Sequence, residues 1–137
     1  NGMLFGDALL IRRPEQFTGI EFTQKQIGHL ASKHRYVSAQ FDALLSYGLW
    51  LELARHANTM AGRLSAGLSG LDLRLAAPTE ANEVFVDLSP ETLAAVRQHF
   101  AVHVPDPVRP TVRFVCSWAT TDDDVDAALT VVQAGCV

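Results

Sequence analysis

The stretch Thr111-Val112-Arg113-Phe114-Val115-Cys116-Ser117-Trp118 predicts a β-strand with one charged residue near its middle. Neighbouring side chains of a strand point to opposite faces, so Val112, Phe114 and Cys116 share one face and Arg113 lies on the other. A guanidinium in an otherwise apolar strand is costly unless water or an anion meets it. Two interpretations remain: an edge strand whose arginine reaches water, or a planar fork that binds a carboxylate.

Helices are predicted after this strand and also before it in the chain. The later helix has Thr121 as its N-cap, Asp122 to Asp124 in its first turn and Gly135 at its end. We interpret the aspartate run as charge at a helix N-terminus and not as a metal cluster. The earlier helix begins at Ser89-Pro90-Glu91, which offers a hydroxyl cap, a proline at the first helical position and a favourable acid.

Short alternating segments accompany these two helices. Apolar residues alternate with polar ones over residues 71–75 and 84–88, and a further short strand is predicted at residues 102–104. We therefore expect residues 71–137 to form a small α+β domain with two helices on one face of a sheet.

The residues before position 71 follow a different pattern. Residues 5–11 predict a strand that ends at Arg12-Arg13-Pro14, because proline lacks the N–H group that a sheet needs. Residues 24–47 have the period of a helix, and Gly48 interrupts it. A second long helix follows and ends near Gly67 and the Ser69-Gly70 pair. Both helices carry apolar stripes that one short strand cannot cover.

The composition suits one ordinary domain or two small lobes, with 137 residues of which 48% are hydrophobic and 19% charged. The formal net charge of -4 does not favour nucleic acid as a partner. No apolar run is long enough to cross a membrane. The two cysteines, Cys116 and Cys136, make neither a disulfide framework nor a metal site. We therefore expect a soluble, cytoplasmic protein.

Lys33, His34 and Arg35 form the densest basic cluster of the chain. On a helix, such a cluster is either a solvated turn or a place where a phosphate binds by charge-assisted hydrogen bonds. No histidine has a partner at metal-ligand spacing, and His103 is interpreted as a structural or surface residue. The sequence contains neither a nucleophile elbow nor a phosphate loop. On chemistry alone it offers an anion-binding arginine but no base and no nucleophile.

Several stretches, taken together and in order, resemble one enzyme family over essentially the whole chain. They are Asn1-Gly2-Met3-Leu4-Phe5-Gly6-Asp7-Ala8, residues 30–41 around Lys33-His34-Arg35-Tyr36, residues 49–51 with 54–58, Ala81-Asn82-Glu83-Val84-Phe85-Val86, and residues 112–118 with Thr120-Thr121 and 124–126. These stretches resemble the low-specificity L-threonine aldolases. The resemblance implies a pyridoxal 5'-phosphate (PLP) enzyme of the aspartate aminotransferase-like α/β fold (fold type I), which cleaves L-threonine or L-allo-threonine to glycine and acetaldehyde.

The resemblance also implies that the chain is the C-terminal part of such an enzyme. Residues 1–70 would be the end of the large PLP-binding domain with its linking helices, and residues 71–137 the small α+β domain. In that family the Schiff-base lysine stands in a Thr-Lys-Asn-Gly-like loop, so it is expected immediately before Asn1, and no catalytic residue is expected within this segment. The family implies a homodimer or homotetramer with shared active sites, which would cover the apolar helix faces.

Three residues take roles from the resemblance. Arg113 matches the arginine that binds the substrate carboxylate. Arg35 matches a basic position near the active site and would contribute to cofactor binding across a subunit boundary, with Lys33 as its weaker companion. No metal site is expected.

Alternative functions stay open at this point. One is a related PLP-dependent enzyme, either a β-eliminating lyase or a phenylserine aldolase. Another is a non-catalytic α/β module in which Arg113 binds a ligand carboxylate and no reaction follows.

Overall fold

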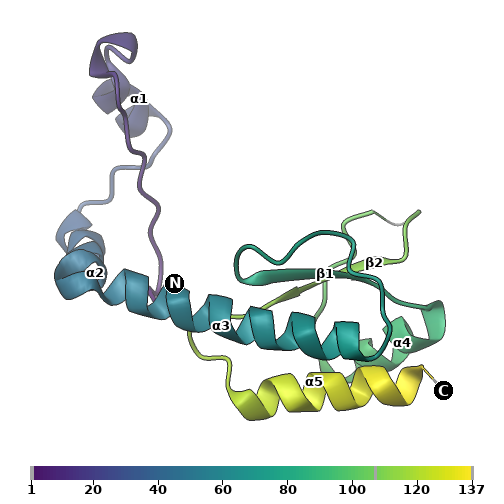
Figure 1. Cartoon of the computed structure of the whole chain (residues 1–137). Coiled ribbons are helices and arrows are strands. Elements are labelled where there is room, and N and C mark those ends of the chain that lie inside the picture. Colours follow the sequence, from purple (N-terminus) through teal and green to yellow (C-terminus); the bar gives the residue numbers. More distant parts are fainter. Residues whose placement is uncertain (1, 107, 137) are drawn as a thin grey trace. The chain divides into compact units, whose positions relative to one another are not determined.

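The computed structural model describes residues 2–106 and 108–136, which form two compact units, Gly2–Leu49 and a second that starts at Trp50 (Figure 1). Asn1, before which the cofactor lysine is expected, lies outside the described residues. The elements in chain order are η1 (Pro14–Gln16), α1 (Ile20–Gln26), α2 (His34–Leu45), η2 (Ser46–Gly48), α3 (Leu49–Gly70), β1 (Glu83–Asp87), α4 (Pro90–His99), β2 (Thr111–Val115) and α5 (Asp122–Gly135).

The second unit is built on an antiparallel pair of strands, β1 and β2. Their register places Phe85 opposite Arg113 and Val86 opposite Val112. The strands expected at residues 71–75 and 102–104 are reduced to single bridges, Leu75 with Val86 and His103 with Arg113. Each of these segments makes only a few ladder hydrogen bonds, since the chain turns directly after α3 and again before the proline-rich loop that precedes β2.

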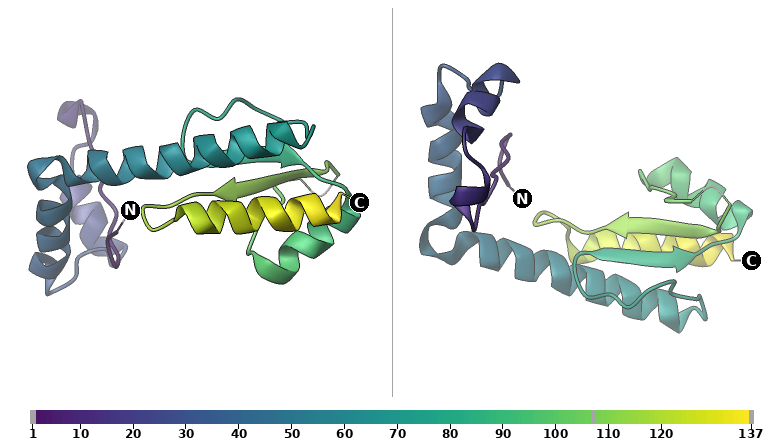
Figure 2. Two further views of the ribbon diagram at one scale, coloured as in Figure 1. Left: turned by 60° about the horizontal axis from the view of Figure 1, so that its bottom comes forward. Right: turned by 90° about the horizontal axis from the view of Figure 1, so that it is seen from above.

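Three helices cover one face of this sheet. Figure 2 shows α5 between α3 and α4, beneath the strands. The apolar core combines residues of all five elements with Leu88 and Cys116 at the strand ends: Met60, Ala61, Leu64, Leu68, Val84, Val86, Leu88, Val96, Val112, Phe114, Cys116, Val125, Ala128 and Val132. The expected layer of α4 and α5 is therefore present, and α3 adds a third helix to it.

Gly67 has a packing role that differs from the predicted one. The sequence suggested that this glycine helps to end the helix, but α3 continues through it to Gly70. A Cβ atom at position 67 would clash with the side chain of Leu129, so the missing side chain lets α3 approach α5 closely. Gly67 is thus explained by contact between helices and not by helix termination.

The N-caps of α4 and α5 are those that the sequence predicted. The Ser89 hydroxyl accepts a hydrogen bond from the Thr92 N–H at 3.1 Å. The Thr121 hydroxyl accepts one from the Asp124 N–H at 3.1 Å, while the Asp124 carboxylate accepts one from the Thr121 N–H at 2.8 Å. This reciprocal pair is a capping box, and it fixes the point at which α5 begins.

The first unit departs from the sequence prediction in two places. Residues 5–11 form no strand, since a strand needs a neighbour to pair with and the described residues provide none for this segment. The helix expected over residues 24–47 is divided into α1 and α2, because Gly28 adopts a φ of +78° and the chain runs without helix up to Lys33. Large apolar side chains of this unit stay exposed, among them Leu9 at 75% and Leu10 at 90%.

The domain division expected at residue 70 refers to the large and small domains of a longer enzyme, and it stays a prediction. Within this chain, α3 packs with the second unit from Trp50 onward.

Candidate carboxylate-binding site

Arg113 stands in the middle of β2, on the face opposite the core. Burial alternates along the strand, with Val112 and Phe114 buried and Arg113 partly exposed, as the sequence predicted. The Arg113 N–H donates to the His103 carbonyl at 2.8 Å, and the His103 N–H donates to the Arg113 carbonyl at 3.4 Å. Phe85 stands opposite Arg113 on the other side, so β2 has a neighbouring segment on each side at this position.

The Arg113 side chain faces an acidic neighbour. Its Nη1 lies 3.2 Å from Glu83 Oε1, and the two side chains are 36% and 39% exposed. Its Nε is buried and has no hydrogen-bond partner among the described residues. The Arg113 side chain is still partly exposed, and a guanidinium has the donor chemistry to bind a carboxylate. The structure therefore places Arg113 between the two interpretations of its sequence: it reaches solvent, and it retains donor capacity.

Asn82, directly before β1, forms hydrogen bonds to Cys116, directly after β2. The Asn82 side-chain amide donates to the Cys116 carbonyl at 2.8 Å, and the Cys116 N–H donates to the Asn82 carbonyl at 2.9 Å. Cys116 is buried, and this burial raises the pKa of its thiol. The sequence interpretation of Cys116 as a small buried apolar residue agrees with this environment.

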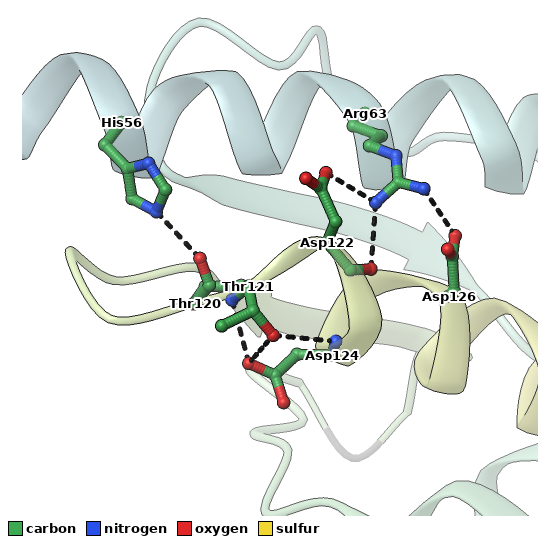
Figure 3. Close-up of polar contacts among 7 residues, drawn as sticks. All are labelled: His56, Arg63, Thr120, Thr121, Asp122, Asp124 and Asp126. Atoms are coloured by element: carbon green, nitrogen blue, oxygen red, sulfur yellow. Dashed lines mark hydrogen bonds and ion pairs between the residues drawn. The ribbon is translucent and has the colours of Figure 1, made fainter.

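The loop that follows β2 is fastened to α3, and Figure 3 shows the contacts. His56 Nε2 lies 2.7 Å from the carbonyl oxygen of Thr120, to which it can donate. Arg63 Nη1 donates to the carbonyl and the carboxylate of Asp122 at 2.8 Å and 2.7 Å, and Nη2 donates to Asp126 at 2.7 Å. These contacts set the position of the loop and of the first turn of α5 relative to α3.

Sequence reasoning missed Arg63 and did not assign His56 a partner. The signal that could have found Arg63 is the spacing of Asp122 and Asp126, which lie one helical turn apart on α5 and so form a paired acceptor for one guanidinium. The capping box lowers the pKa of Asp124, through the hydrogen bond from the Thr121 backbone first and from its hydroxyl second.

Lys33 and Arg35 lie at the start of α2, in the first unit. Both are exposed, and Lys33 is the N-cap residue, where the backbone N–H groups of the first turn add positive partial charge. The Arg35 guanidinium lies 5.3 Å from the centre of the Tyr36 ring. Neither basic side chain has an ion pair among the residues described. The neighbouring cavity of this unit includes His34 in its lining but neither Lys33 nor Arg35.

Arg113 belongs to the second unit. Lys33 and Arg35 belong to the first unit. Within the described ranges, no group of three or more His, Cys, Asp or Glu side chains is arranged to hold a metal ion. None of the described helices has the length and apolar character needed to cross a membrane.

Comparison with curated proteins finds two low-specificity L-threonine aldolases. One, from a Pseudomonas species, is 38% identical over 128 residues, which make up 89% of this chain and 36% of that protein. The other, from Pseudomonas aeruginosa, is 35% identical over 126 residues, or 88% of this chain and 35% of that protein. No family model matches the chain.

A solved structure of threonine aldolase from Leishmania major matches with a TM-score of 0.77 and 30% sequence identity. The match covers 85% of this chain and 35% of that one. The resemblance found in the sequence and the expected α/β fold class, part of a fold type I enzyme, are thereby confirmed. The chain spans about a third of the length of the relatives that it matches.

Proposed function

We propose that this chain is the substrate-binding part of a PLP-dependent aldolase. It is related over most of its length to the low-specificity L-threonine aldolases. The reaction is cleavage of L-threonine or L-allo-threonine to glycine and acetaldehyde. The observation that carries this proposal is Arg113, a partly open guanidinium on a strand that has a neighbouring segment on each side.

Arg113 supplies orientation. Its guanidinium binds the α-carboxylate of the amino acid and fixes the rotation of the substrate about its Cα, so that the Cα–Cβ bond is the one aligned for cleavage. A planar fork suits this task better than a point charge, because two parallel hydrogen bonds define an angle as well as a distance. The Arg113 backbone, paired with His103 and Phe85, keeps this fork at a fixed place.

The first unit supplies basic groups that fit the phosphate of PLP. Lys33 and Arg35 are exposed cations at the start of a helix of 12 residues, where an anion is favoured by charge and by free N–H groups. When bound, PLP acts as the electron sink for the cleavage. Arg35 and Lys33 would hold its phosphate, with Arg35 acting across a subunit boundary in a homodimer or homotetramer.

The exposed apolar residues of the first unit support assembly. Leu9, Leu10 and Phe22 are 75%, 90% and 67% exposed, and a partner subunit would cover such side chains. Both cysteines are free thiols, in keeping with a reducing compartment such as the cytoplasm.

Product analysis tests the proposed reaction. The full-length protein is incubated with PLP and L-threonine, and the account expects glycine and acetaldehyde in equal amounts. A β-eliminating lyase would give 2-oxobutanoate and ammonia instead. A phenylserine aldolase would cleave phenylserine with a much higher kcat/KM than threonine. Absence of any turnover, together with retained binding of amino acid carboxylates, would support the non-catalytic module.

A further inference from the structure

Glu83 forms an ion pair with one Nη atom of the Arg113 guanidinium in this structure. The contact joins Glu83 Oε1 to Arg113 Nη1 at 3.2 Å, across the diagonal of the β1–β2 register. Both side chains remain more than a third exposed, so a small molecule in solution can reach the pair. An ion pair of this exposure contributes little to stability, and the fold does not depend on it.

Arg113 has few N–H groups left to bind a substrate carboxylate. A carboxylate can bind a guanidinium bidentately along an edge that includes Nε or across the end formed by the two Nη atoms. Nε is buried, so the edge that includes it is covered. The end formed by Nη1 and Nη2 remains, and Glu83 already lies against Nη1.

We propose that Glu83 is an internal competitor for the substrate carboxylate at Arg113. This inference rests on the proposed function, in which Arg113 binds the α-carboxylate. A substrate carboxylate bound across the two Nη atoms would lie beside the Glu83 carboxylate, and repulsion between the two anions opposes binding while Glu83 stays at Nη1. Glu83 therefore sets how tightly an amino acid is held, and it keeps the guanidinium paired while no substrate is present.

The backbone around Glu83 is fixed by hydrogen bonds and packing, so the Glu83 carboxylate stays close to the Arg113 guanidinium. Asn82 and Cys116 exchange two hydrogen bonds, of 2.8 Å and 2.9 Å, directly beside Glu83. The neighbouring Val84 is fully buried in the core. The side chain of Glu83 can swing into solvent, while its Cα stays fixed next to β2.

Acetate protection of Arg113 measures this competition in the full-length protein. Phenylglyoxal modifies accessible guanidinium groups, and the adduct at Arg113 is quantified by mass spectrometry of its peptide. Sodium acetate replaces sodium chloride at constant ionic strength, so that only carboxylate binding changes. The proteins compared are wild type, Glu83→Gln and Glu80→Gln. Glu80 is an exposed glutamate in the loop before β1, and its substitution makes the same change in net charge.

The expected result is a lower acetate concentration for half-protection in Glu83→Gln, by about two- to fivefold, the range that an exposed ion pair provides. Glu80→Gln should protect like wild type. In steady-state assays with L-threonine, Glu83→Gln should lower KM by a similar factor, with a smaller change in kcat.

Three results would overturn the inference. Equal half-protection in wild type and Glu83→Gln would show that Glu83 does not compete, while leaving Arg113 as a carboxylate site. Weaker protection in Glu83→Gln would show that Glu83 orients Arg113 and does not oppose the substrate. If acetate protects Arg113 in none of the three proteins, Arg113 does not bind carboxylates, and the inference is overturned with that role.

Discussion

His56 Nε2 lies 2.7 Å from the carbonyl oxygen of Thr120, and this contact ties α3 to the loop that carries the chain from β2 into α5. The strand that holds Arg113 thus continues into a loop whose far end is fixed to a long helix. We expect His56→Ala to reduce the free energy of unfolding by about 0.5–1.5 kcal/mol, as for loss of one ordinary hydrogen bond. His99→Ala, at the exposed end of α4, is the matched control and should have a smaller effect in the same denaturant titration. An equal loss in both variants would mean that the His56 contact does not hold the loop.

The capping box at α5 makes a prediction that depends on pH. The folded protein lowers the pKa of Asp124 below its ordinary value of 3.8, so the ionised carboxylate stabilises the fold above that pH. This contribution is lost as the pH falls through the lower folded pKa. Asp124→Asn should therefore be less stable than wild type at neutral pH, and the difference between the two should shrink below about pH 4. A difference that stays constant down to pH 2 would contradict the capping role of the charge.

Thr121 supplies the other half of the capping box. Thr121→Ala removes the hydroxyl that accepts from the Asp124 N–H, and we expect a loss of about 1 kcal/mol in the free energy of unfolding. Thr121→Ser keeps an acceptor at the same place and should lose much less. If both substitutions cost the same, the hydroxyl is not the group that matters.

Gly67 and Gly62 lie on the same helix and provide a test of the α3–α5 contact. A Cβ atom at position 67 would meet Leu129, whereas one at position 62 meets nothing within 4 Å. Gly67→Ala should destabilise the fold by about 1–3 kcal/mol through overpacking. Gly62→Ala should stabilise it by about 0.5–1 kcal/mol, since alanine favours helix over glycine. The double variant Gly67→Ala with Leu129→Ala should recover part of the loss. Opposite signs for the two glycines are the decisive outcome, and equal signs would refute the packing account.

The features of the second unit that the sequence predicted correctly have local signals. The caps at Ser89 and Thr121, the alternation along β1 and β2 and the placement of Arg113 opposite Val112 all depend on neighbouring residues, and the structure has each of them. The resemblance to threonine aldolases was also readable, since its stretches are spread over the whole chain.

The features that the sequence did not reveal depend on contacts between distant residues. Gly67 looked like a helix end because its partner, Leu129, lies on another helix. Arg63 looked like an ordinary exposed cation because Asp122 and Asp126 approach it only in the folded unit. The strand predicted at residues 5–11 failed for the converse reason, since alternation shows which residues suit a strand but not whether another strand is present to pair with it.

The kcat/KM of Arg113 variants with L-threonine, measured in the full-length protein with PLP, tests the central claim most directly. Arg113→Ala should lower kcat/KM at least about 30-fold, which corresponds to about 2 kcal/mol for a charge-assisted bidentate pair, with PLP still bound. Arg113→Lys should recover only part, because a point charge does not reproduce the fork. Arg74→Ala, which removes an exposed arginine paired with Asp87, is the matched control and should stay near wild type. A kcat/KM for Arg113→Ala within about twofold of wild type, a change of less than about 0.5 kcal/mol, would contradict the account.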